Sequence, residues 1–398
     1  MWISKIKISN FKSLVDFEID LAKFNCLIGL NGSGKSTVLQ AIDFLAQLIR
    51  GDMKGWLRKR RWRPEELTSQ LLNSNRIGFS VEFDEFDLQV NIREKLIWSG
   101  QYDIVEQYCI VERFETENRF VAVEDNELKW PEGDLDPEFK LSPNPVPQSK
   151  IVWKYQGSVF SSFTPAYPRW AFGIKSQLDY YFKSLRSLEM LSPNLLRRRS
   201  ERAPYEIGLG GEGFSLYLSM LGPEKRSRIL DRLQQIYPRI MAIETESLPS
   251  GRGRVKIREN FGSEGFVTQA HHVNDGLLRM TALFALLEGR YQFLLFDEIE
   301  NGINPELVKF VIETLTQAQQ QILVTTHSPV ILNFLEDDMA RQSVIYLDKR
   351  ENGTTRATPF FKIPSVDRKL SVMGPGEAFV DTDLLHLGDE IDRMAESR

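Results

Sequence analysis

The residues with the clearest chemistry form a glycine-rich stretch near the beginning of the chain. From Gly29 to Ser36 the sequence reads GLNGSGKS, which fits the phosphate-binding pattern G-x-x-x-x-G-K-[ST] at each constrained position. The glycines let the backbone curve around an anion, the lysine reaches the β- and γ-phosphates of a nucleotide, and the last serine ligates Mg²⁺. We therefore expect ATP with Mg²⁺ at a site formed by Asn31, Gly32, Ser33, Gly34, Lys35, Ser36 and Thr37.

A second stretch supplies two carboxylates. Residues 293–298 read FLLFDE, an apolar run followed directly by Asp297 and Glu298. A buried strand would deliver both acids to its carboxyl end, which is where ligands bind in open α/β sheets. We expect Asp297 to join Ser36 in holding Mg²⁺, and Glu298 to orient or deprotonate the attacking water.

A histidine follows another apolar strand. Residues 321–326 read as a core strand that ends at His327, one of only four histidines in the chain. This strand end is expected at the same sheet edge as the two acids, so His327 is interpreted as the residue that senses or polarises the γ-phosphate. The predicted catalytic residues are Glu298, His327 and Lys35.

The elements around these residues can be read from local patterns. Residues 24–28 have the composition of a buried strand, and apolar residues at helical spacing continue from Ser36 to about residue 49. A loop between a strand end and a helix N-terminus directs backbone N–H groups and the helix dipole at one point. Asn304-Pro305 and Ser328-Pro329 each have the order of an N-cap followed by proline, so helices are expected after both.

The bulk composition limits the class of protein. The chain has 398 residues, of which 42% are hydrophobic and 26% are charged, as in a water-soluble globular protein. This length suits two or three domains, or one domain split by an insertion. Its apolar runs are too short to cross a bilayer, and two cysteines make no disulfide framework, so a cytoplasmic location is expected. A net charge of −5 means that any nucleic-acid site must be local.

One local cluster is strongly basic. Between residues 51 and 63, Trp56 and Trp62 are interleaved with Lys54, Arg58, Lys59, Arg60, Arg61 and Arg63. Cations with aromatic rings suit nucleic-acid phosphates and bases. The same composition also suits a solvated helix end or a surface that forms salt bridges, and residues 197–202, with four arginines, carry the same two interpretations.

The middle of the chain reads differently from its ends. Residues 2–9 and 14–21 alternate as two strands, and residues 76–160 are mostly short β runs: 76–83, 86–98, 108–114, 120–123 and 151–155, with a proline-rich loop at 141–147. Residues 177–191 return to helical spacing, and helices are expected at 214–220 and 229–237. The glycine loop 208–213 lacks a preceding strand and a following lysine, so it is not interpreted as a phosphate site.

The order of these motifs resembles a known family. NFKS at 10–13, the phosphate loop, NDG at 274–276, FDE at 296–298, ENG at 300–302 and TTHSP at 325–329 resemble the ABC-type ATPases of the SMC/RecF branch. They resemble more closely the compact bacterial AAA-family ATPases, which include the ATPase half of OLD nucleases and occur in anti-phage defence systems. The resemblance covers roughly residues 1–50 and 205–398.

The resemblance implies an α/β fold, a P-loop NTPase of ABC-ATPase type with a mixed central sheet flanked by helices. Residues 1–63 and 203–398 would form the split nucleotide-binding domain, and residues 64–202 an inserted β-rich and then helical lobe. Two protomers would sandwich ATP head to tail, with Asn274, Asp275 and Gly276 as the signature acting in trans and residues 301–304 coupling the sites. Asn274 departs from the usual serine and Asn304 from a common histidine. Gln148, Gln156 and Gln177 remain alternatives for the family's conserved glutamine.

The resemblance also implies a function. We expect an ATP-hydrolysing switch that works as a homodimer or higher homo-oligomer and controls a separately encoded effector, a nuclease or a toxin, in antiviral defence. About seventy residues after His327 are too few for a nuclease domain, and no long heptad run predicts a coiled-coil arm. The alternative is a RecF-like DNA-binding ATPase in DNA repair or maintenance, and a third is an assembly protein that binds nucleotide without useful turnover.

Overall fold

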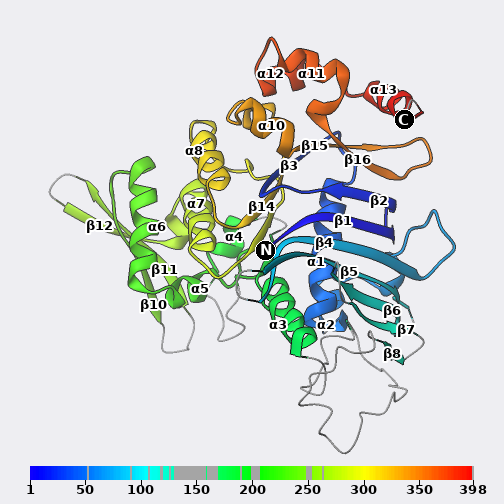
Figure 1. Ribbon diagram of the computed structural model, residues 1–398. Helices are drawn as coiled ribbons and strands as arrows, with labels where there is room; N and C mark the ends of the chain where they lie inside the picture. Colours follow the sequence, from blue (N-terminus) through cyan, green and yellow to red (C-terminus); the bar gives the residue numbers. More distant parts are fainter. Residues whose placement is uncertain are drawn as a thin grey trace, which may run out of the picture. The chain divides into compact units, whose positions relative to one another are not determined.

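A computed structural model of the chain describes residues 1–51, 53–89, 92–105, 108–116, 120–124, 127–129, 158, 169–188, 191–198, 207–247, 253–261 and 264–396. The chain divides into two compact units, Met1–Leu185 with Asp337–Arg398, and Arg186–Glu336. Figure 1 shows the helices and strands of both units coloured along the chain. Among the residues described, none of the helices combines the length and apolar character needed to cross a membrane.

The first unit contains a seven-stranded antiparallel sheet in the order β2-β1-β4-β5-β6-β7-β8. Its strands are β1 (Trp2–Phe11), β2 (Leu14–Asp20), β4 (Arg76–Gln89), β5 (Ile92–Asp103), β6 (Tyr108–Glu115), β7 (Phe120–Glu124) and β8 (Glu127–Lys129). Phe79, Val81 and Phe83 are buried, whereas the alternate residues Gly78 and Ser80 are partly accessible. One face of the sheet therefore belongs to the core.

The buried face of this sheet packs against helix α3 (Arg169–Lys183), which also contacts α1 (Lys35–Arg50). The rings of Trp98 and Phe182 lie edge to face with centroids 5.1 Å apart. Glu112 is fully buried, and its carboxylate accepts hydrogen bonds from Trp98 Nε1 (2.8 Å) and Ser158 Oγ (2.6 Å). The burial of this carboxylate is thus compensated by two donors.

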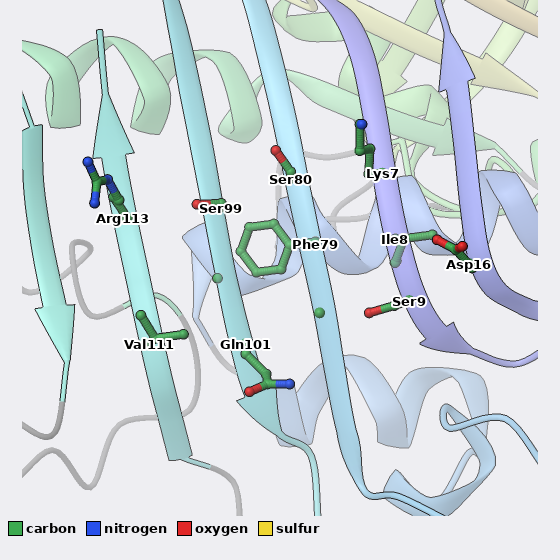
Figure 2. Close-up of a pocket in the computed structure, with 12 residues that line it drawn as sticks. Lys7, Ile8, Ser9, Asp16, Phe79, Ser80, Ser99, Gln101, Val111 and Arg113 are labelled. Atoms are coloured by element: carbon green, nitrogen blue, oxygen red, sulfur yellow. The ribbon is translucent and has the colours of Figure 1, made fainter. Parts of the chain in front are cut away.

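The opposite face of the sheet carries small polar residues between longer charged ones. The strand register places Lys7, Ser80, Ser99 and Arg113 side by side across β1, β4, β5 and β6. Figure 2 shows these side chains on neighbouring strands, where they line a hollow of about 500 Å³. The hollow exists because Gly78, Ser80 and Ser99 are small, whereas Lys7 and Arg113 on the flanking strands are long and charged.

Three further strands of the first unit support the glycine-rich stretch. β3 (Phe24–Ile28), which is buried at every residue, runs parallel to β15 (Val344–Lys349), and β15 is antiparallel to β16 (Thr355–Pro359). Around β15 and β16 lie the helices of the C-terminal part (Figure 1). The remaining helices of the unit are α2 (Met53–Arg60), α10 (Asp337–Ser343), α11 (Pro364–Leu370), α12 (Pro375–Val380) and α13 (Leu387–Glu396), with short 3-10 turns at Pro64–Glu66 and Phe360–Lys362.

The second unit carries the acidic motif on a parallel strand pair. β13 (Phe293–Phe296) and β14 (Gln321–Thr325) are parallel and fully buried. A separate antiparallel sheet contains β10 (Ile240–Ser247), β11 (Gly253–Phe261) and β12 (Glu264–Gln269). The other elements are β9 (Leu185–Leu188), α4 (Pro193–Leu196), α5 (Phe214–Met220), α6 (Pro223–Ile236), α7 (Asp275–Leu287), α8 (Pro305–Thr316) and α9 (Pro329–Leu332), with a 3-10 turn at Ala270–His272.

Most of the predicted elements are confirmed, and two are wrong. The strand predicted over residues 86–98 belongs to two paired strands, because β4 ends at Gln89 and β5 begins at Ile92. β3 has the predicted bounds, and α1 begins one residue before the expected position. The helix predicted over residues 177–191 ends at Lys183, and Leu185–Leu188 is strand β9, beside β13. Leucines three residues apart fit a helix, but pairing within a sheet overrode that local preference. Residues 141–147 and 151–155 lie outside the described residues, and the domain boundaries at 63 and 203 stay a prediction.

Candidate functional site

The glycine-rich stretch connects β3 to α1. Gly29, Gly32 and Gly34 have φ values of 145°, 79° and 108°, in a region that residues with side chains rarely adopt. α1 begins at Lys35 with Gly34 as its N-cap, and no acidic residue lies in its first turn. The first N–H groups of a helix have no intrahelical acceptor, so this loop ends in a site suited to an anion.

The loop is held by Thr355, the first residue of β16. The Thr355 hydroxyl donates to the carbonyl of Ser33 (3.0 Å), and its Oγ1 lies 2.8 Å from Ser13 Oγ. A Cβ on Gly34 would lie 2.6 Å from Thr355 Oγ1, so only glycine permits this close approach. The Ser33 hydroxyl is buried and has no hydrogen-bond partner among the described residues. A phosphate oxygen would satisfy it, so the loop fits a phosphate group.

Lys35 lies inside the loop, whereas the loop tip is accessible. Its side chain is 6% exposed, and Nζ donates to the carbonyls of Gly29 (2.8 Å) and Leu30 (3.1 Å). Asn31 and Ser36 are exposed. The ammonium is therefore held next to the amides of the loop, where it would pair with a phosphate.

A cavity of about 190 Å³ opens beside the loop tip. It is lined by residues 30–33, by residues 346–349 at the end of β15, and by Leu384, Leu385 and Gly388. The wall that comes from the C-terminal segment thus lies next to the phosphate loop within the first unit.

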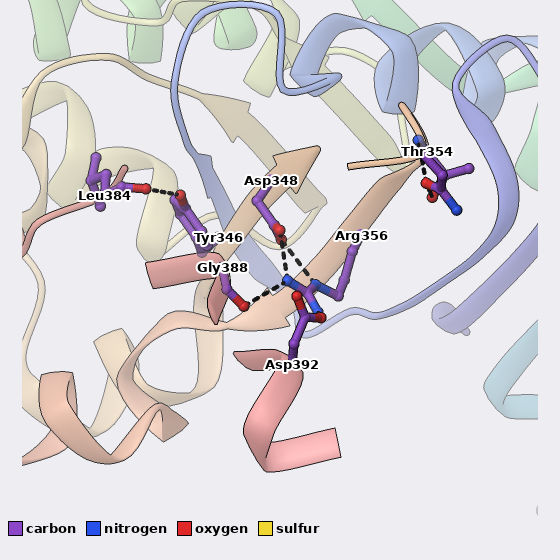
Figure 3. A network of polar contacts seen from close by, with 8 residues as sticks. Tyr346, Asp348, Thr354, Arg356, Leu384, Gly388 and Asp392 are labelled. Atoms are coloured by element: carbon purple, nitrogen blue, oxygen red, sulfur yellow. Dashed lines mark hydrogen bonds and ion pairs between the residues drawn. The ribbon is translucent and has the colours of Figure 1, made fainter. Parts of the chain in front are cut away.

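Arg356 fixes this C-terminal segment (Figure 3). Its guanidinium pairs with Asp348 of β15 (2.7 Å) and with Asp392 of α13. The hydroxyl of Tyr346 donates to the carbonyl of Leu384 (2.9 Å), and burial, with the nearby Asp348 carboxylate, raises the pKa of Tyr346 to about 12. Tyr346 consequently stays a neutral donor at physiological pH.

The acidic pair follows β13 in the second unit, at the expected strand end. Asp297 Oδ1 accepts a hydrogen bond from Thr325 Oγ1 (2.5 Å), and the same Oγ1 accepts from the backbone N–H of Glu298 (2.9 Å). Glu298 has a φ of 49°, an uncommon conformation for a residue with a side chain. Unfavourable backbone conformations of this kind are retained where the surrounding contacts fix them.

His327 is linked to the acidic segment by Glu300. Glu300 Oε1 accepts hydrogen bonds from Thr326 Oγ1 (2.9 Å) and from the backbone N–H of His327 (3.0 Å). Asn301 Nδ2 donates to Glu298 Oε2 (3.0 Å). The His327 side chain is exposed, so it can reach a ligand outside this cluster.

The expected signature segment forms the N-terminus of α7. Asn274 is its N-cap, and the side-chain oxygen accepts from the N–H of Leu277 (2.7 Å). Arg197 donates to the carbonyl of Val273 (2.7 Å) and pairs with Asp275. Arg197 therefore makes contacts within the protein. For this residue of the basic cluster at 197–202, a salt-bridging role fits better than contact with nucleic acid.

The start of α7 also lies against the loop after the acidic pair. A Cβ on Gly276 would lie 3.5 Å from the carbonyl of Gly302, and a Cβ on Gly302 would lie 2.9 Å from Arg279 Cζ. Gly302 has a φ of 68°, which favours glycine, and a side chain at this position would collide with Arg279. Burial lowers the pKa of Arg279, and the Asp275 carboxylate opposes this shift. The signature and the loop 301–304 are neighbours within one unit.

The basic cluster at residues 54–63 divides into inward and outward side chains. Arg60 is 2% exposed at its side chain and pairs with buried Asp43 of α1 (2.5 Å), to which Trp56 Nε1 also donates (2.7 Å). Lys12 Nζ lies 3.6 Å from the ring centroid of Trp62. The predicted nucleic-acid role is thus wrong for Arg60, and both tryptophans have internal partners. The exposed cations are Lys54, Arg58, Lys59, Arg61 and Arg63.

The glycine loop 208–213 is already occupied by a carboxylate of the chain itself. Glu212 Oε2 accepts from the N–H of Gly210 (3.1 Å), and a Cβ on Gly208 would lie 2.2 Å from the Glu212 carboxyl carbon. Because an anion of the chain fills this loop, it is not a second phosphate site.

The predicted site residues thus form two sets. The residues from Asn31 to Thr37 lie together in the first unit, and Asp297, Glu298 and His327 lie with the signature in the second. Sequence reasoning missed Thr355, Thr325 and Glu300, which hold these sets. The sequence did point to Thr325 and Glu300, because Thr325 belongs to the TTHSP motif and Glu300 to the ENG motif. Those two motifs were noted for other residues.

Comparisons with known proteins agree with this architecture. A crystal structure of the SmcHead bound to the C-winged helix domain of ScpA superposes with a TM-score of 0.51 at 15% identity, covering 90% of this chain and 97% of that chain. An Smc head domain with an extended coiled coil, bound to the C-terminal domain of ScpA derived from Pyrococcus furiosus, gives a TM-score of 0.50 at 13% identity, with 93% and 99% covered. These similarities show the fold, that of a P-loop ABC-type ATPase.

Sequence comparison identifies the family. An OLD nuclease of Thermus scotoductus (strain ATCC 700910 / SA-01) is 30% identical over 82 residues, which is 21% of this chain and only 14% of the length of that relative. The family described as "AAA domain, putative AbiEii toxin, Type IV TA system" matches residues 24–333. Because this match covers most of the chain, the protein belongs to that family of AAA-domain proteins.

Proposed function

We propose that the chain binds ATP with Mg²⁺ and hydrolyses it to ADP and phosphate. The observation that carries this proposal is the phosphate loop, with its glycine backbone, its internal lysine and the Ser33 hydroxyl, which has no hydrogen-bond partner in the described part of the chain. Membership of an AAA family supports it. We also propose that the phosphate loop (residues 31–37) and the second set (Asp297, Glu298 and His327) bind the same ATP molecule.

Each residue has a proposed role in binding. Lys35 and the amides of residues 31–37 would hold the β- and γ-phosphates. Ser36 and Asp297 would hold Mg²⁺, which when bound offsets the phosphate charge. Among the described residues, no group of three or more His, Cys, Asp or Glu side chains can hold a metal. A magnesium ion that completes its shell with phosphate oxygens and water fits so sparse a donor set.

The reaction itself would depend on Glu298 and His327. The Glu298 carboxylate takes a proton from water as the water oxygen bonds to the γ-phosphorus and the bond to the ADP oxygen breaks. His327, exposed at the end of β14, would contact the γ-phosphate. Asn301 holds one oxygen of Glu298, which limits the orientations of its carboxylate.

We propose further that two copies dimerise head to tail, so that Asn274, Asp275 and Gly276 of each copy contact the nucleotide of the other. The capped N-terminus of α7 supports this role, because helix N-termini bind anions. In the same proposal residues 1–63 and 203–398 form the nucleotide-binding domain, and residues 64–202 are inserted into it.

The biological role is a proposal from the family. Its description names a putative toxin of a type IV toxin–antitoxin system, which supports a cytoplasmic ATPase that controls a separately encoded effector, a nuclease or a toxin, in antiviral defence. The local match to an OLD nuclease is consistent with the proposed role in antiviral defence. The fold itself does not define the partner, since one fold carries many functions.

Two variants test the proposal. Glu298→Gln keeps the size of the side chain but removes the base, so it should bind ATP, hydrolyse it at least about 100-fold more slowly and accumulate as an ATP-bound dimer. Lys35→Ala should lose ATP binding and stay in the nucleotide-free state. Light scattering with and without ATP and Mg²⁺ reports the dimer, and phosphate release reports the rate. If Glu298→Gln hydrolyses ATP at the parental rate, the assignment of the base is wrong.

A second candidate function, binding of duplex DNA, is supported by the outward cations. Arg58, Lys59, Arg61 and Arg63 are exposed, and no ion pair links them to a carboxylate in the part of the chain that the structure describes. Since both neighbouring tryptophans have internal partners, stacking on bases is not their role. Phosphate contacts to a duplex therefore fit this surface better than a single strand does.

Salt titration tests the second candidate. Replacing Arg58, Lys59 and Arg61 by glutamine should weaken duplex DNA binding and reduce the slope of log affinity against log salt by about three. A control variant with Lys225, Lys309 and Lys362 replaced loses the same charge elsewhere and should bind as the parent does. Equal losses in the two variants would contradict a localised DNA surface.

A further inference from the structure

Thr325 occupies a fully buried position between the two acids of the candidate site. It is the last residue of β14 and is 0% exposed. Phe296 pairs with Val324 in the parallel register of β13 and β14, so Thr325 lies across from Asp297. A buried polar side chain at a strand end needs partners, and its partners here are the proposed metal ligand Asp297 and the proposed base Glu298.

One hydroxyl makes two different hydrogen bonds. The Thr325 proton is donated to Asp297 Oδ1 (2.5 Å), and the Thr325 oxygen accepts the backbone N–H of Glu298 (2.9 Å). A hydroxyl has one proton and two lone pairs, so both bonds form at once. The backbone carbonyl of Thr325 also accepts from Ile299 N–H (3.2 Å). The chain from residue 297 to residue 299 is therefore fastened to a single residue of β14.

This attachment coincides with the unusual backbone of Glu298. At a φ of 49° the residue needs outside contacts to keep its conformation, and its own N–H is bonded to Thr325. The direction of the Glu298 side chain follows from that backbone conformation. Thr325 thus bonds both to the Asp297 carboxylate and to the backbone of Glu298.

We propose that Thr325 is a positioning residue for ATP hydrolysis, one that fixes Asp297 and Glu298 through its hydroxyl without contacting substrate. This inference rests on the proposed function. It predicts a loss in turnover larger than the loss in ATP binding, because phosphate contacts are made by the loop of the first unit. The expected loss is roughly 10- to 100-fold, as for a displacement of about 1 Å in a catalytic group.

The test compares Thr325→Val, which removes the hydroxyl but keeps the branched shape, with Thr325→Ser, which keeps the hydroxyl. In the full chain, Thr325→Val should lower kcat roughly 10- to 100-fold with KM for ATP within about threefold of the parent. Thr325→Ser should restore kcat to within about threefold. Thr314→Val is the matched control and should behave as the parent. The Thr314 hydroxyl bonds to its own helix, at the carbonyl of Phe310 (2.7 Å), and to no other group among the described residues. If Thr325→Val does not fold, Thr325→Ala replaces it in every comparison.

A double-mutant cycle separates positioning from a general loss of packing. Because Thr325 is proposed to act through both acids, Thr325→Val should slow the Glu298→Gln variant by a smaller factor than it slows the parent. Full additivity would overturn the inference, as would parental kcat in Thr325→Val or an equally slow Thr325→Ser. A parental protein that fails to hydrolyse ATP would instead overturn the proposed function, so the two failures are distinguishable.

Discussion

At the scale of single residues, small hydroxyl side chains hold the backbone where the chemistry is expected. Thr355 bonds to the phosphate loop at Ser33, and Thr325 bonds to both acids after β13. Each is almost completely buried, at 1% and 0% exposure. Such residues are difficult to recognise in a sequence, because threonine is common in strands for reasons of shape alone.

The glycines of the phosphate loop allow a matched comparison. Gly34→Ala would place Cβ 2.6 Å from Thr355 Oγ1, whereas the Cβ of Gly32→Ala would meet nothing within 4 Å. Both changes introduce positive-φ strain of about 1–2 kcal/mol, and Gly34→Ala adds about 1–3 kcal/mol for the collision. Urea unfolding without nucleotide should therefore show the larger loss of stability for Gly34→Ala. Equal losses would contradict the tight packing of Thr355 on the loop.

A pH titration tests the segment beside the cavity. Asp383 Oδ2 lies 2.7 Å from His386 Nδ1, and this hydrogen bond raises the pKa of His386 above its ordinary 6.5 and lowers the pKa of Asp383. The ion pair is therefore fully formed at pH values between the lowered pKa of Asp383 and the raised pKa of His386. It is lost as pH rises through the histidine pKa or falls through the aspartate pKa. By NMR, His386 should titrate above pH 6.5, and Asp383→Asn should remove the shift. An unshifted midpoint in the parent would refute the pairing.

At the scale of elements, α2 contacts the phosphate-loop helix through the Asp43 carboxylate and through the ring of Trp56, whose centroid lies 6.2 Å from that of Phe44. Asp43 of α1 is 4% exposed and accepts from Trp56 and Arg60 of α2. The cations that face outward are therefore carried on a helix whose position depends on α1. Any ligand bound by that surface would act on an element that contacts the nucleotide-binding helix directly.

Removing the shared carboxylate should be costly. Asp43→Asn removes the carboxylate that pairs with the buried guanidinium of Arg60, and we expect a loss of about 3–5 kcal/mol in the free energy of unfolding. Asp16→Asn, at an exposed acid of the same unit, should change it by less than about 0.5 kcal/mol. Adding Arg60→Met to Asp43→Asn should recover part of the loss. Chemical denaturation of the four proteins decides whether the pair holds α2.

Local sequence patterns predicted where helices and strands lie, but they did not predict the contacts between those elements. The strand Phe24–Ile28 and the helix after it follow from composition and spacing within a few residues. β9 did not follow, because its leucines fit a helix until a neighbouring strand is known. The bond from Thr325 to Asp297 depends on the register of two strands separated by a helix, and packing rather than local sequence sets that register.

At the scale of the whole molecule, the predicted site residues are shared between two units. The phosphate loop belongs to one unit, and the acids, His327 and the signature belong to the other. In the proposed function, a nucleotide held by both sets would favour the nucleotide-bound state by its binding free energy, and ATP would act as a switch in this way.

Mixing two inactive variants tests the proposed sharing of sites between copies. Lys35→Ala disables the phosphate loop, and Gly276→Asp places a carboxylate at the start of α7, where it would repel a triphosphate. In a head-to-tail dimer, a mixed pair has one site that carries both changes and one site that carries neither. An equal mixture should therefore recover about one quarter of the parental ATPase rate, because half of random pairs are mixed. A mixture as inactive as its components would argue against action in trans.

The backbone at Glu298 has a consequence for protein engineering. A residue held at a φ of 49° carries a conformational penalty of about 1–2 kcal/mol that glycine would not have. Laboratory evolution that rewards heat resistance alone would thus favour Glu298→Gly, a change that discards the proposed base. Thermostable descendants of this protein should be screened for turnover at every round, since robustness and activity are opposed at this position.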